Sequence, residues 1–153
     1  MTHVQLQTPL DRRQSERLLQ FCLDSGVDCF SVGFVYWEER QLRRVQTEVF
    51  DRFAPFTLGK RLLERTVVPE GRERVVPMEC WSLNAQTIRL ILDACDGSLT
   101  SYEMGRLPED WTFYRNDRVF SGIVSHEQYA FLLLPDEDFQ RFKLLGLPFT
   151  VRQ

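Results

Sequence analysis

Apolar residues recur every three or four positions in several segments, which is the pattern of helices with one buried face. The clearest case follows Asn84, where apolar residues fall at positions i, i+3, i+4 and i+7: Ile88, Ile91, Leu92 and Cys95. Asn84 is also a favourable residue for capping the start of such a helix. We predict helices over residues 9–25, 42–53, 84–95 and 136–145, and a short helix over residues 56–65.

Other segments alternate apolar and polar residues, or are rich in β-branched and aromatic residues, and both patterns favour strands. Residues 27–37 combine valines with aromatic residues, which predicts a strand that is buried on both faces for part of its length. The pair Asn116–Asp117 is typical of a turn between two strands. We predict strands over residues 4–7, 27–37, 66–68, 74–78, 111–114, 118–124 and 129–134, with 66–68 and 74–78 forming a hairpin.

These elements follow the order β-α-β-α-β-β-α-β-β-β-α. Consecutive strands joined by short loops favour antiparallel pairing, so we predict an α+β fold. Its antiparallel or mixed sheet would carry helices packed mainly on one face. The 153 residues contain no internal repeat and no linker long enough to divide them, which indicates a single α+β domain over residues 1–153.

The composition is that of an ordinary globular domain, with 43% apolar and 27% charged residues. No apolar run approaches the length of a spanning helix, and the first residues lack the features of a signal peptide. We therefore expect a cytoplasmic protein without membrane contact. The four cysteines form no C-x-x-C pair and have no histidine at ligand spacing, so we expect reduced, buried thiols and no metal site.

Histidine is scarce, which limits the catalytic chemistry available to the chain. Ser125, His126 and Glu127 are the residue types of a hydrolytic triad, but adjacent residues of an extended chain point in opposite directions. The sequence has no glycine-rich phosphate loop and no G-x-S-x-G motif, so we predict no cofactor. A small cytoplasmic enzyme remains an alternative, in which His126 acts with Glu79 or Glu103. Burial would raise the pKa of either carboxyl.

The charge is unevenly distributed, although the net charge is only −3. Residues 40–74 carry nine basic and five acidic residues, whereas residues 93–138 carry three basic and ten acidic residues. A pI near 5.5 and only two lysines disfavour binding to nucleic acid. One interpretation is an acidic face that meets a basic partner, and the other is that these charges interleave and cancel in the folded chain.

The acidic segment also holds aromatic residues of the kind that anchor protein interfaces, unless they only cover the ends of the sheet. We predict a non-enzymatic protein that binds another, basic protein through Glu103, Glu109, Asp110, Trp111, Tyr114, Asp117 and Glu127. A small protein that is acidic in this way and lacks a catalytic motif is similar to bacterial immunity proteins. That resemblance implies an inhibitor, monomeric or weakly dimeric, that masks the active site of a toxin domain. The remaining alternative is a structural or regulatory subunit of a larger complex, with an exposed apolar patch.

Overall fold

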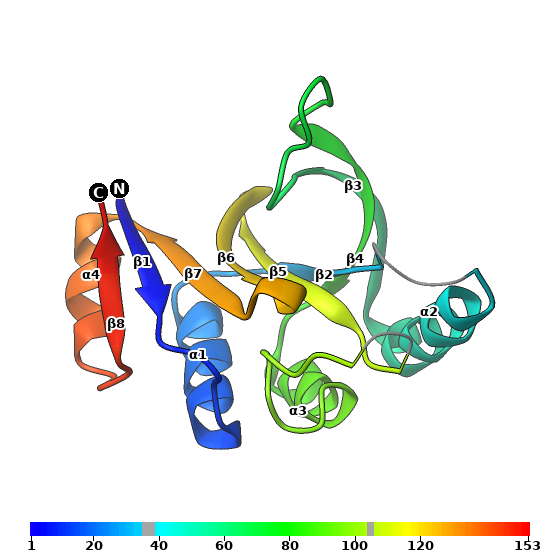
Figure 1. Cartoon of the computed structure of the whole chain (residues 1–153), viewed down its shortest axis with the longest axis horizontal. Coiled ribbons are helices and arrows are strands. Elements are labelled where there is room, and N and C mark those ends of the chain that lie inside the picture. The colour runs from blue at the N-terminus through cyan, green and yellow to red at the C-terminus, as the bar shows by residue number, and fades with distance from the viewer. Residues whose placement is uncertain (35–38, 104–105) are drawn as a thin grey trace.

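The computed structural model describes residues 1–34, 39–103 and 106–153, and within them eight strands form one sheet (Figure 1). The helices are α1 (Arg12–Asp24), α2 (Glu39–Phe53), α3 (Ala85–Ala94) and α4 (Asp136–Lys143). The strands are β1 (Thr2–Leu6), β2 (Cys29–Gly33), β3 (Thr57–Glu64), β4 (Val75–Ser82), β5 (Glu109–Arg115), β6 (Arg118–Val124), β7 (Tyr129–Leu134) and β8 (Phe149–Arg152). In the spatial order β3-β4-β2-β5-β6-β7-β1-β8, every neighbouring pair is antiparallel. The predicted α+β fold is confirmed.

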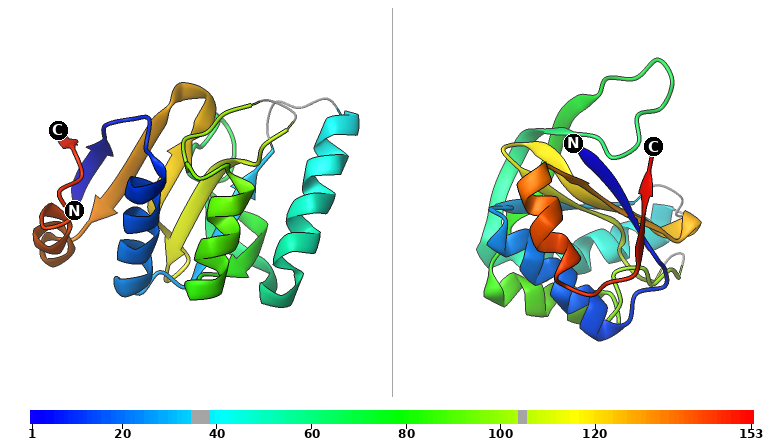
Figure 2. Two further views of the ribbon diagram at one scale, coloured as in Figure 1. Left: turned by 90° about the horizontal axis from the view of Figure 1, so that it is seen from below. Right: turned by 90° about the vertical axis from the view of Figure 1, so that its left-hand side faces the viewer.

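Three helices cover one face of the sheet. In Figure 2, α1, α3 and α2 stand side by side across this face. The fourth helix, α4, packs at the β8 end, where the ring of Phe142 lies 5.6 Å from that of Phe21 in α1. The helices therefore lie mainly on one face, as predicted. Over the described ranges, no helix has the length and apolar character needed to cross a membrane.

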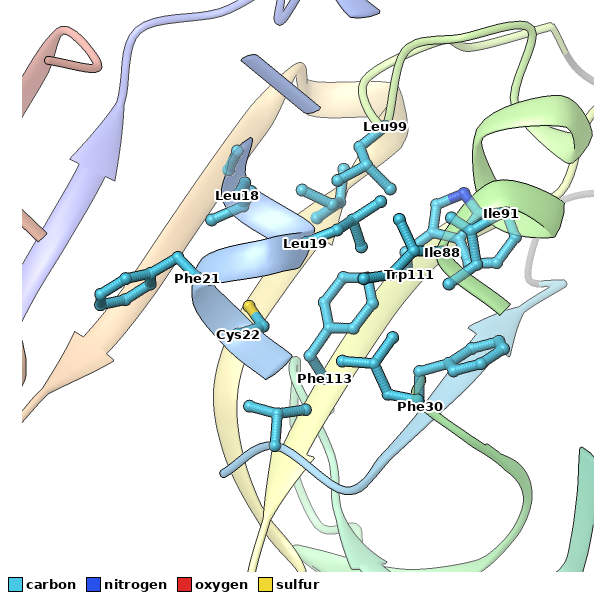
Figure 3. Close-up of a cluster of buried hydrophobic side chains, with 14 of the residues drawn as sticks. Leu18, Leu19, Phe21, Cys22, Phe30, Ile88, Ile91, Leu99, Trp111 and Phe113 are labelled. Carbon is cyan, nitrogen blue, oxygen red and sulfur yellow. The ribbon is translucent and has the colours of Figure 1, made fainter. Parts of the chain in front are cut away.

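The covered face holds the main hydrophobic core (Figure 3). Trp111 and Phe113 of β5 are fully buried there, together with Leu19 of α1 and Ile91 of α3. Phe30 of β2 lies within 6.1–6.3 Å of both β5 rings, close enough for aromatic contact. Burying one large apolar side chain contributes about 1.5–3 kcal/mol, so each of these residues stabilises the fold by an amount of that order.

Side-chain caps explain where the helices begin. Asn84 caps α3, as predicted. Helix α1 begins at Arg12, three residues later than expected, because Asp11 caps it and Thr8 does not. The Asp11 carboxylate accepts the N–H of Gln14 at 2.7 Å, and the Gln14 side chain accepts the N–H of Asp11 at 2.9 Å. This reciprocal pair satisfies two donors that a helix start leaves unpaired.

Residues 56–65, for which we predict a short helix, are mainly strand β3. Leu58 and Leu62 have helical spacing, but they are 44% and 64% exposed, and only the adjacent Leu63 is buried. The strand pairs with β4, so the hairpin is formed by residues 57–64 and 75–82. The predicted strand over residues 66–68 is wrong, because these residues lie in the loop that joins β3 to β4. Strand β8 is not predicted at all, since it is short and mostly exposed. The part of the predicted 27–37 strand at residues 35–37 lies outside the described residues.

The sheet curls over the face that α1, α2 and α3 leave uncovered. The β3–β4 hairpin bends until Glu64 meets the β5–β6 turn, where its N–H donates to the Asp117 carbonyl at 3.4 Å. The Glu64 carboxylate accepts the N–H of Val119 at 3.2 Å. The hydroxyls of Thr66 and Thr112 lie 2.7 Å apart across the same gap. Figure 1 shows this arch, and we refer to β3, β4, β2, β5 and β6 together as the half-barrel.

All four cysteines are free and buried, in agreement with the sequence. Cys29 and Cys80 lie in a small cluster inside the half-barrel, together with Leu63 and Tyr114. Burial raises the pKa of Cys29 to about 12, so this thiol stays protonated at neutral pH. A protonated, buried thiol acts as a small apolar side chain.

Candidate ligand-binding cleft

The half-barrel encloses a half-open cleft of about 570 Å³. Strands β2 and β5 form its floor, the β3–β4 hairpin forms one wall, and the turn Ser125–Glu127 closes one end. The lining residues include Ser31, Gly33, Thr66, Val67, Val76, Met78, Asp110, Thr112, Tyr114, His126 and Glu127. Ligand sites in proteins are commonly clefts of about 300–1,000 Å³ with apolar walls and a few polar groups, and this cleft has that character.

Strand β5 shapes the cleft because its side chains alternate between the two faces of the sheet. Trp111 and Phe113 enter the core beneath the helices. Asp110, Thr112 and Tyr114 line the cleft. One strand therefore supplies both the centre of the core and the floor of the cleft.

Hydroxyl groups connect the walls of the cleft. The phenol of Tyr114 and the hydroxyl of Ser31 form a buried hydrogen bond of 2.9 Å between β5 and β2. Thr66 and Thr112 connect the hairpin to β5 in the same way. Burial raises the pKa of Tyr114 to about 12, so its phenol is neutral at physiological pH. These groups give the floor a polar but uncharged surface.

Asp110 adopts a backbone conformation that is unusual for a non-glycine residue. Its φ is 50°, in the left-handed region, and it lies where the β2–β5 pairing shifts register next to Gly33. A Cβ on Gly33 would lie only 2.8 Å from the Cβ of Asp110, so the Asp110 side chain needs a glycine at this position. Strained residues of this kind persist where the surrounding structure holds them, and they are frequent at functional sites.

Ser125 fixes the position of the Asp110 carboxylate. The N–H of Ser125 donates to Asp110 Oδ1 at 2.9 Å, and the N–H of Asp110 donates to Ser125 Oγ at 2.9 Å. The amide of Gln128 donates to the Ser125 carbonyl at 3.0 Å, which holds the turn itself. Among the described residues, no donor is hydrogen-bonded to Asp110 Oδ2. The Ser125 N–H thus uses one acceptor position of this carboxylate, and as far as the described residues go the other positions can accept donors from a ligand.

The titratable groups gather at one end of the cleft. Burial raises the pKa of Asp110, and the charge of Glu127 adds to this effect, whereas the Ser125 N–H and nearby His126 oppose it. His126 Nε2 lies 3.8 Å from Glu127 Oε1, so the two form an ion pair when the imidazole is protonated. Arg65 lines the hairpin wall of the same cleft. We call the end of the cleft formed by Asp110 and Glu127 the acidic end.

Three of the seven residues predicted to bind a partner are not at the surface. Glu109, Trp111 and Tyr114 are 0%, 0% and 1% exposed, so the expectation that they form an exposed interface is wrong. The reason is that β5 is a central strand, covered by helices on one face and by the curled hairpin on the other. Trp111 is a core residue, and the Tyr114 phenol forms part of the cleft floor.

The remaining predicted residues do not form one acidic face. Glu103 is ion-paired with Arg106 at 2.7 Å, and Asp117 lies 3.7 Å from Arg61. Only Asp110 and Glu127 lie together, at the acidic end of the cleft. For Glu103 and Asp117, the structure matches the alternative interpretation, in which neighbouring charges cancel. That Asp110 and Glu127 contact a partner remains a prediction.

The enzyme alternative also takes a different form in the structure. Glu79 lines a separate hollow of about 190 Å³, and neither it nor Glu103 is among the residues that line the cleft with His126. The carboxylates that share the cleft with His126 are Asp110 and Glu127. The candidate carboxylates for an acid–base pair with His126 are therefore Asp110 and Glu127, in place of Glu79 and Glu103.

Sequence reasoning did not single out Ser31, Gly33, Thr66 or Thr112. The alternation in residues 110–114 contains a usable signal, because it places Thr112 on the same side as Asp110 and Tyr114. No local pattern identifies Thr66, which reaches the cleft only because the hairpin curls back over the sheet.

A second hollow, of about 430 Å³, lies between α2 and the end of α3. Three of its charged groups are in ion pairs within the protein: Arg106 contacts Asp96 at 2.6 Å, and Asp93 lies 3.9 Å from Arg12. The cleft is larger than this hollow and holds a carboxylate fixed by backbone hydrogen bonds, so it is the better candidate site.

No cluster of three or more possible metal ligands occurs in the part of the chain that the structure describes. Comparison with protein-family models, with curated proteins and with solved structures finds no match to this chain.

Proposed function

We propose that this protein is a binding protein, and that a segment of a partner protein enters the cleft. The observation that carries the proposal is the fixed Asp110 carboxylate at one end of an apolar-walled cleft of about 570 Å³. The acidic end suits a partner that is basic where it makes contact. An inhibitor of the immunity type, which covers the active site of a toxin domain, is one form of this proposal.

The chemistry of the walls supports binding of a side chain. Val67, Val76 and Met78 offer apolar surface on the hairpin, opposite the hydroxyls of the floor. Val67 is 61% exposed, so part of this surface is in contact with water until something covers it. Apolar surface removed from water contributes roughly 25 cal/mol per Å², and the polar groups then select the orientation of the ligand.

The test is affinity capture from the cells that produce the protein, with the wild type and two matched variants. Val67→Trp places a large ring at the mouth of the cleft, whereas Val151→Trp makes the same change on β8 at the opposite edge of the sheet. Both valines are exposed, at 61% and 49%, so both variants should fold. We expect a partner that is retained by the wild type and by Val151→Trp and lost with Val67→Trp. Equal retention of all captured proteins by both variants would contradict the proposal.

One observation favours a second candidate function, acid–base catalysis. Asp110 and His126 lie at the same end of the cleft, and the raised pKa of Asp110 brings its protonation closer to neutral pH. Hydrolysis of p-nitrophenyl acetate above the protein-free rate should then be lost in His126→Ala and in Asp110→Asn. It should be kept in His3→Ala, which changes the other histidine, on β1. A wild-type rate equal to the protein-free rate removes ester hydrolysis as a candidate.

A further inference from the structure

We propose that the group recognised in the cleft is a single lysine side chain of the partner, with its ammonium on Asp110 and its aliphatic stem along the hairpin wall. This inference rests on the proposed function and names the chemistry of its ligand. Its basis is the position of the fixed Asp110 carboxylate in a cleft whose hairpin wall holds Val67, Val76 and Met78.

The argument begins with what places the carboxylate in the cleft. Asp110 is in the left-handed region with φ 50°, and its side chain fills the space that a Cβ on Gly33 would need. The reciprocal bonds to Ser125 then hold it. A conformation this restricted orients Asp110 before any ligand arrives, and pre-organisation reduces the free-energy cost of binding.

The hydrogen bonding of the carboxylate selects the kind of cation. Oδ1 accepts the N–H of Ser125 at 2.9 Å, and no donor from the described residues is hydrogen-bonded to Oδ2. A guanidinium group binds carboxylates best through two parallel hydrogen bonds, which needs both oxygens. An ammonium is a compact point charge that needs one strong acceptor and can turn its other hydrogens toward neighbouring groups. A guanidinium fork on Asp110 would have to share Oδ1 with the Ser125 N–H, whereas an ammonium needs only Oδ2, and on this ground we choose lysine over arginine.

The surroundings of the carboxylate fit the rest of a lysine side chain. Glu127 lies at the same end and supplies a second negative charge, while Val67, Val76 and Met78 line the hairpin wall together with the cation of Arg65. Lysine commonly buries its methylene stem along apolar surface and keeps its charged end on polar groups. Burial makes the carboxylate costly to ionise while it is alone, and a cation placed against it offsets that cost.

The test uses small probes and backbone amide NMR spectra of the whole protein. Nα-acetyl-lysine N-methylamide carries the proposed ammonium group. Its norleucine analogue carries an apolar side chain without the charge, and its arginine analogue carries a planar guanidinium group. We expect the lysine probe to shift the amide signals of Gly33, Asp110 and Ser125 saturably. It should bind about tenfold more tightly than the norleucine probe, a difference of about 1.4 kcal/mol, because only the lysine probe can hydrogen-bond the charged carboxylate. The arginine probe should bind more weakly than the lysine probe.

Two variants tie the preference to Asp110. Asp110→Asn keeps an oxygen acceptor for the Ser125 N–H and tolerates the left-handed conformation, so the fold should be retained while the lysine preference is lost. Asp117→Asn removes an exposed carboxylate at the β5–β6 turn, and it should leave the preference unchanged. Loss of the preference in Asp117→Asn, or its survival in Asp110→Asn, would overturn the inference.

The inference and the proposed function fail in different ways. If lysine and norleucine probes shift the cleft signals equally, or if neither shifts them while Val67→Trp still abolishes capture of the partner, the cleft binds a partner but not through lysine. If Val67→Trp leaves the captured proteins unchanged, the proposed function fails, whatever the probes do. Tighter binding of arginine than lysine also overturns the choice of cation.

Discussion

The two faces of the sheet are built by the same strands, and they bury different kinds of side chain. The face beneath α1, α2 and α3 is filled by aromatic and aliphatic residues such as Phe30, Trp81, Trp111 and Phe113. The inner face of the half-barrel carries hydroxyls, two thiols and the Asp110 carboxylate around a cleft. The first arrangement maximises buried apolar area, whereas the second gives up part of that area for groups that hydrogen-bond.

This difference indicates how one strand can serve stability and binding together. Along β5, a substitution at Trp111 or Phe113 acts on the core, and one at Asp110 or Thr112 acts on the cleft. Each face can therefore be changed with limited effect on the other. Variants on opposite sides of the same strand are the most direct measure of that separation.

The largest effect is expected from Phe113→Ala, set against Thr112→Ala one residue away. Removing a fully buried phenylalanine from the covered face should lower the free energy of unfolding by about 3–5 kcal/mol. Thr112→Ala removes the hydrogen bond to Thr66 and should cost only about 1 kcal/mol. Urea unfolding at 25 °C measures both. Equal losses in the free energy of unfolding would show that the two faces contribute equally to stability, and would contradict the difference proposed here.

A smaller effect is expected from Gly122→Ala, which tests the closure of the half-barrel. A Cβ at this position would lie 2.8 Å from the ring of Phe131 and 2.9 Å from Cγ2 of Thr66. Overpacking of this kind typically costs about 1–3 kcal/mol, which thermal unfolding can detect. Thr66→Ser removes that methyl group and keeps the hydroxyl, so it should recover part of the loss when combined with Gly122→Ala. Simple additivity of the two changes would argue against a closed contact between the hairpin and β6.

The elements that sequence predicts well are those fixed by local signals. Asn84 caps α3, and the turn at Asn116–Asp117 joins β5 to β6, as their residue types indicate. The errors occur where pairing between distant segments decides the outcome. Residues 57–64 fit helical spacing at Leu58 and Leu62, and their strand state depends on pairing with β4. Strand β8 depends in the same way on β1 at the other end of the chain.

The site is less predictable than the fold for the same reason. Alternation along β5 places Asp110 and Thr112 on one side, but it does not show that Glu64 bonds the β5–β6 turn and folds the hairpin over them. Without that contact, Tyr114 would be expected at an exposed surface, where acidic and aromatic residues suggest an interface. The charge count identified Asp110 and Glu127, and it missed the uncharged groups that complete the cleft.

A moderate effect is expected from Tyr114→Phe, which removes one hydroxyl from the cleft floor. The partner of that hydroxyl, Ser31, is 5% exposed and would lose its 2.9 Å hydrogen bond. The free energy of unfolding should fall by about 1 kcal/mol, as measured by urea unfolding. The double variant Ser31→Ala with Tyr114→Phe removes both polar groups and should cost less than the sum of the single changes. A sum that matches the double variant would mean that the two hydroxyls do not depend on each other.

The smallest effect is expected in the pH dependence of stability, and it belongs to Asp110. Burial raises the pKa of this carboxyl in the folded protein. In the pH window between its ordinary and its raised pKa, a larger fraction of Asp110 is therefore protonated in the folded state than in the unfolded state. The free energy of unfolding therefore falls as the pH rises through that window, and above it the full cost of the buried charge remains. Asp110→Asn has no charge to bury, so its stability relative to the wild type should increase as the pH rises through that window and stay higher above it. Urea unfolding at a series of pH values measures the difference, and a difference independent of pH would mean that the carboxylate is solvated like a surface group. Because the cleft is half open and the Ser125 N–H bonds the charged form, the gain should stay below the effects of the three changes above.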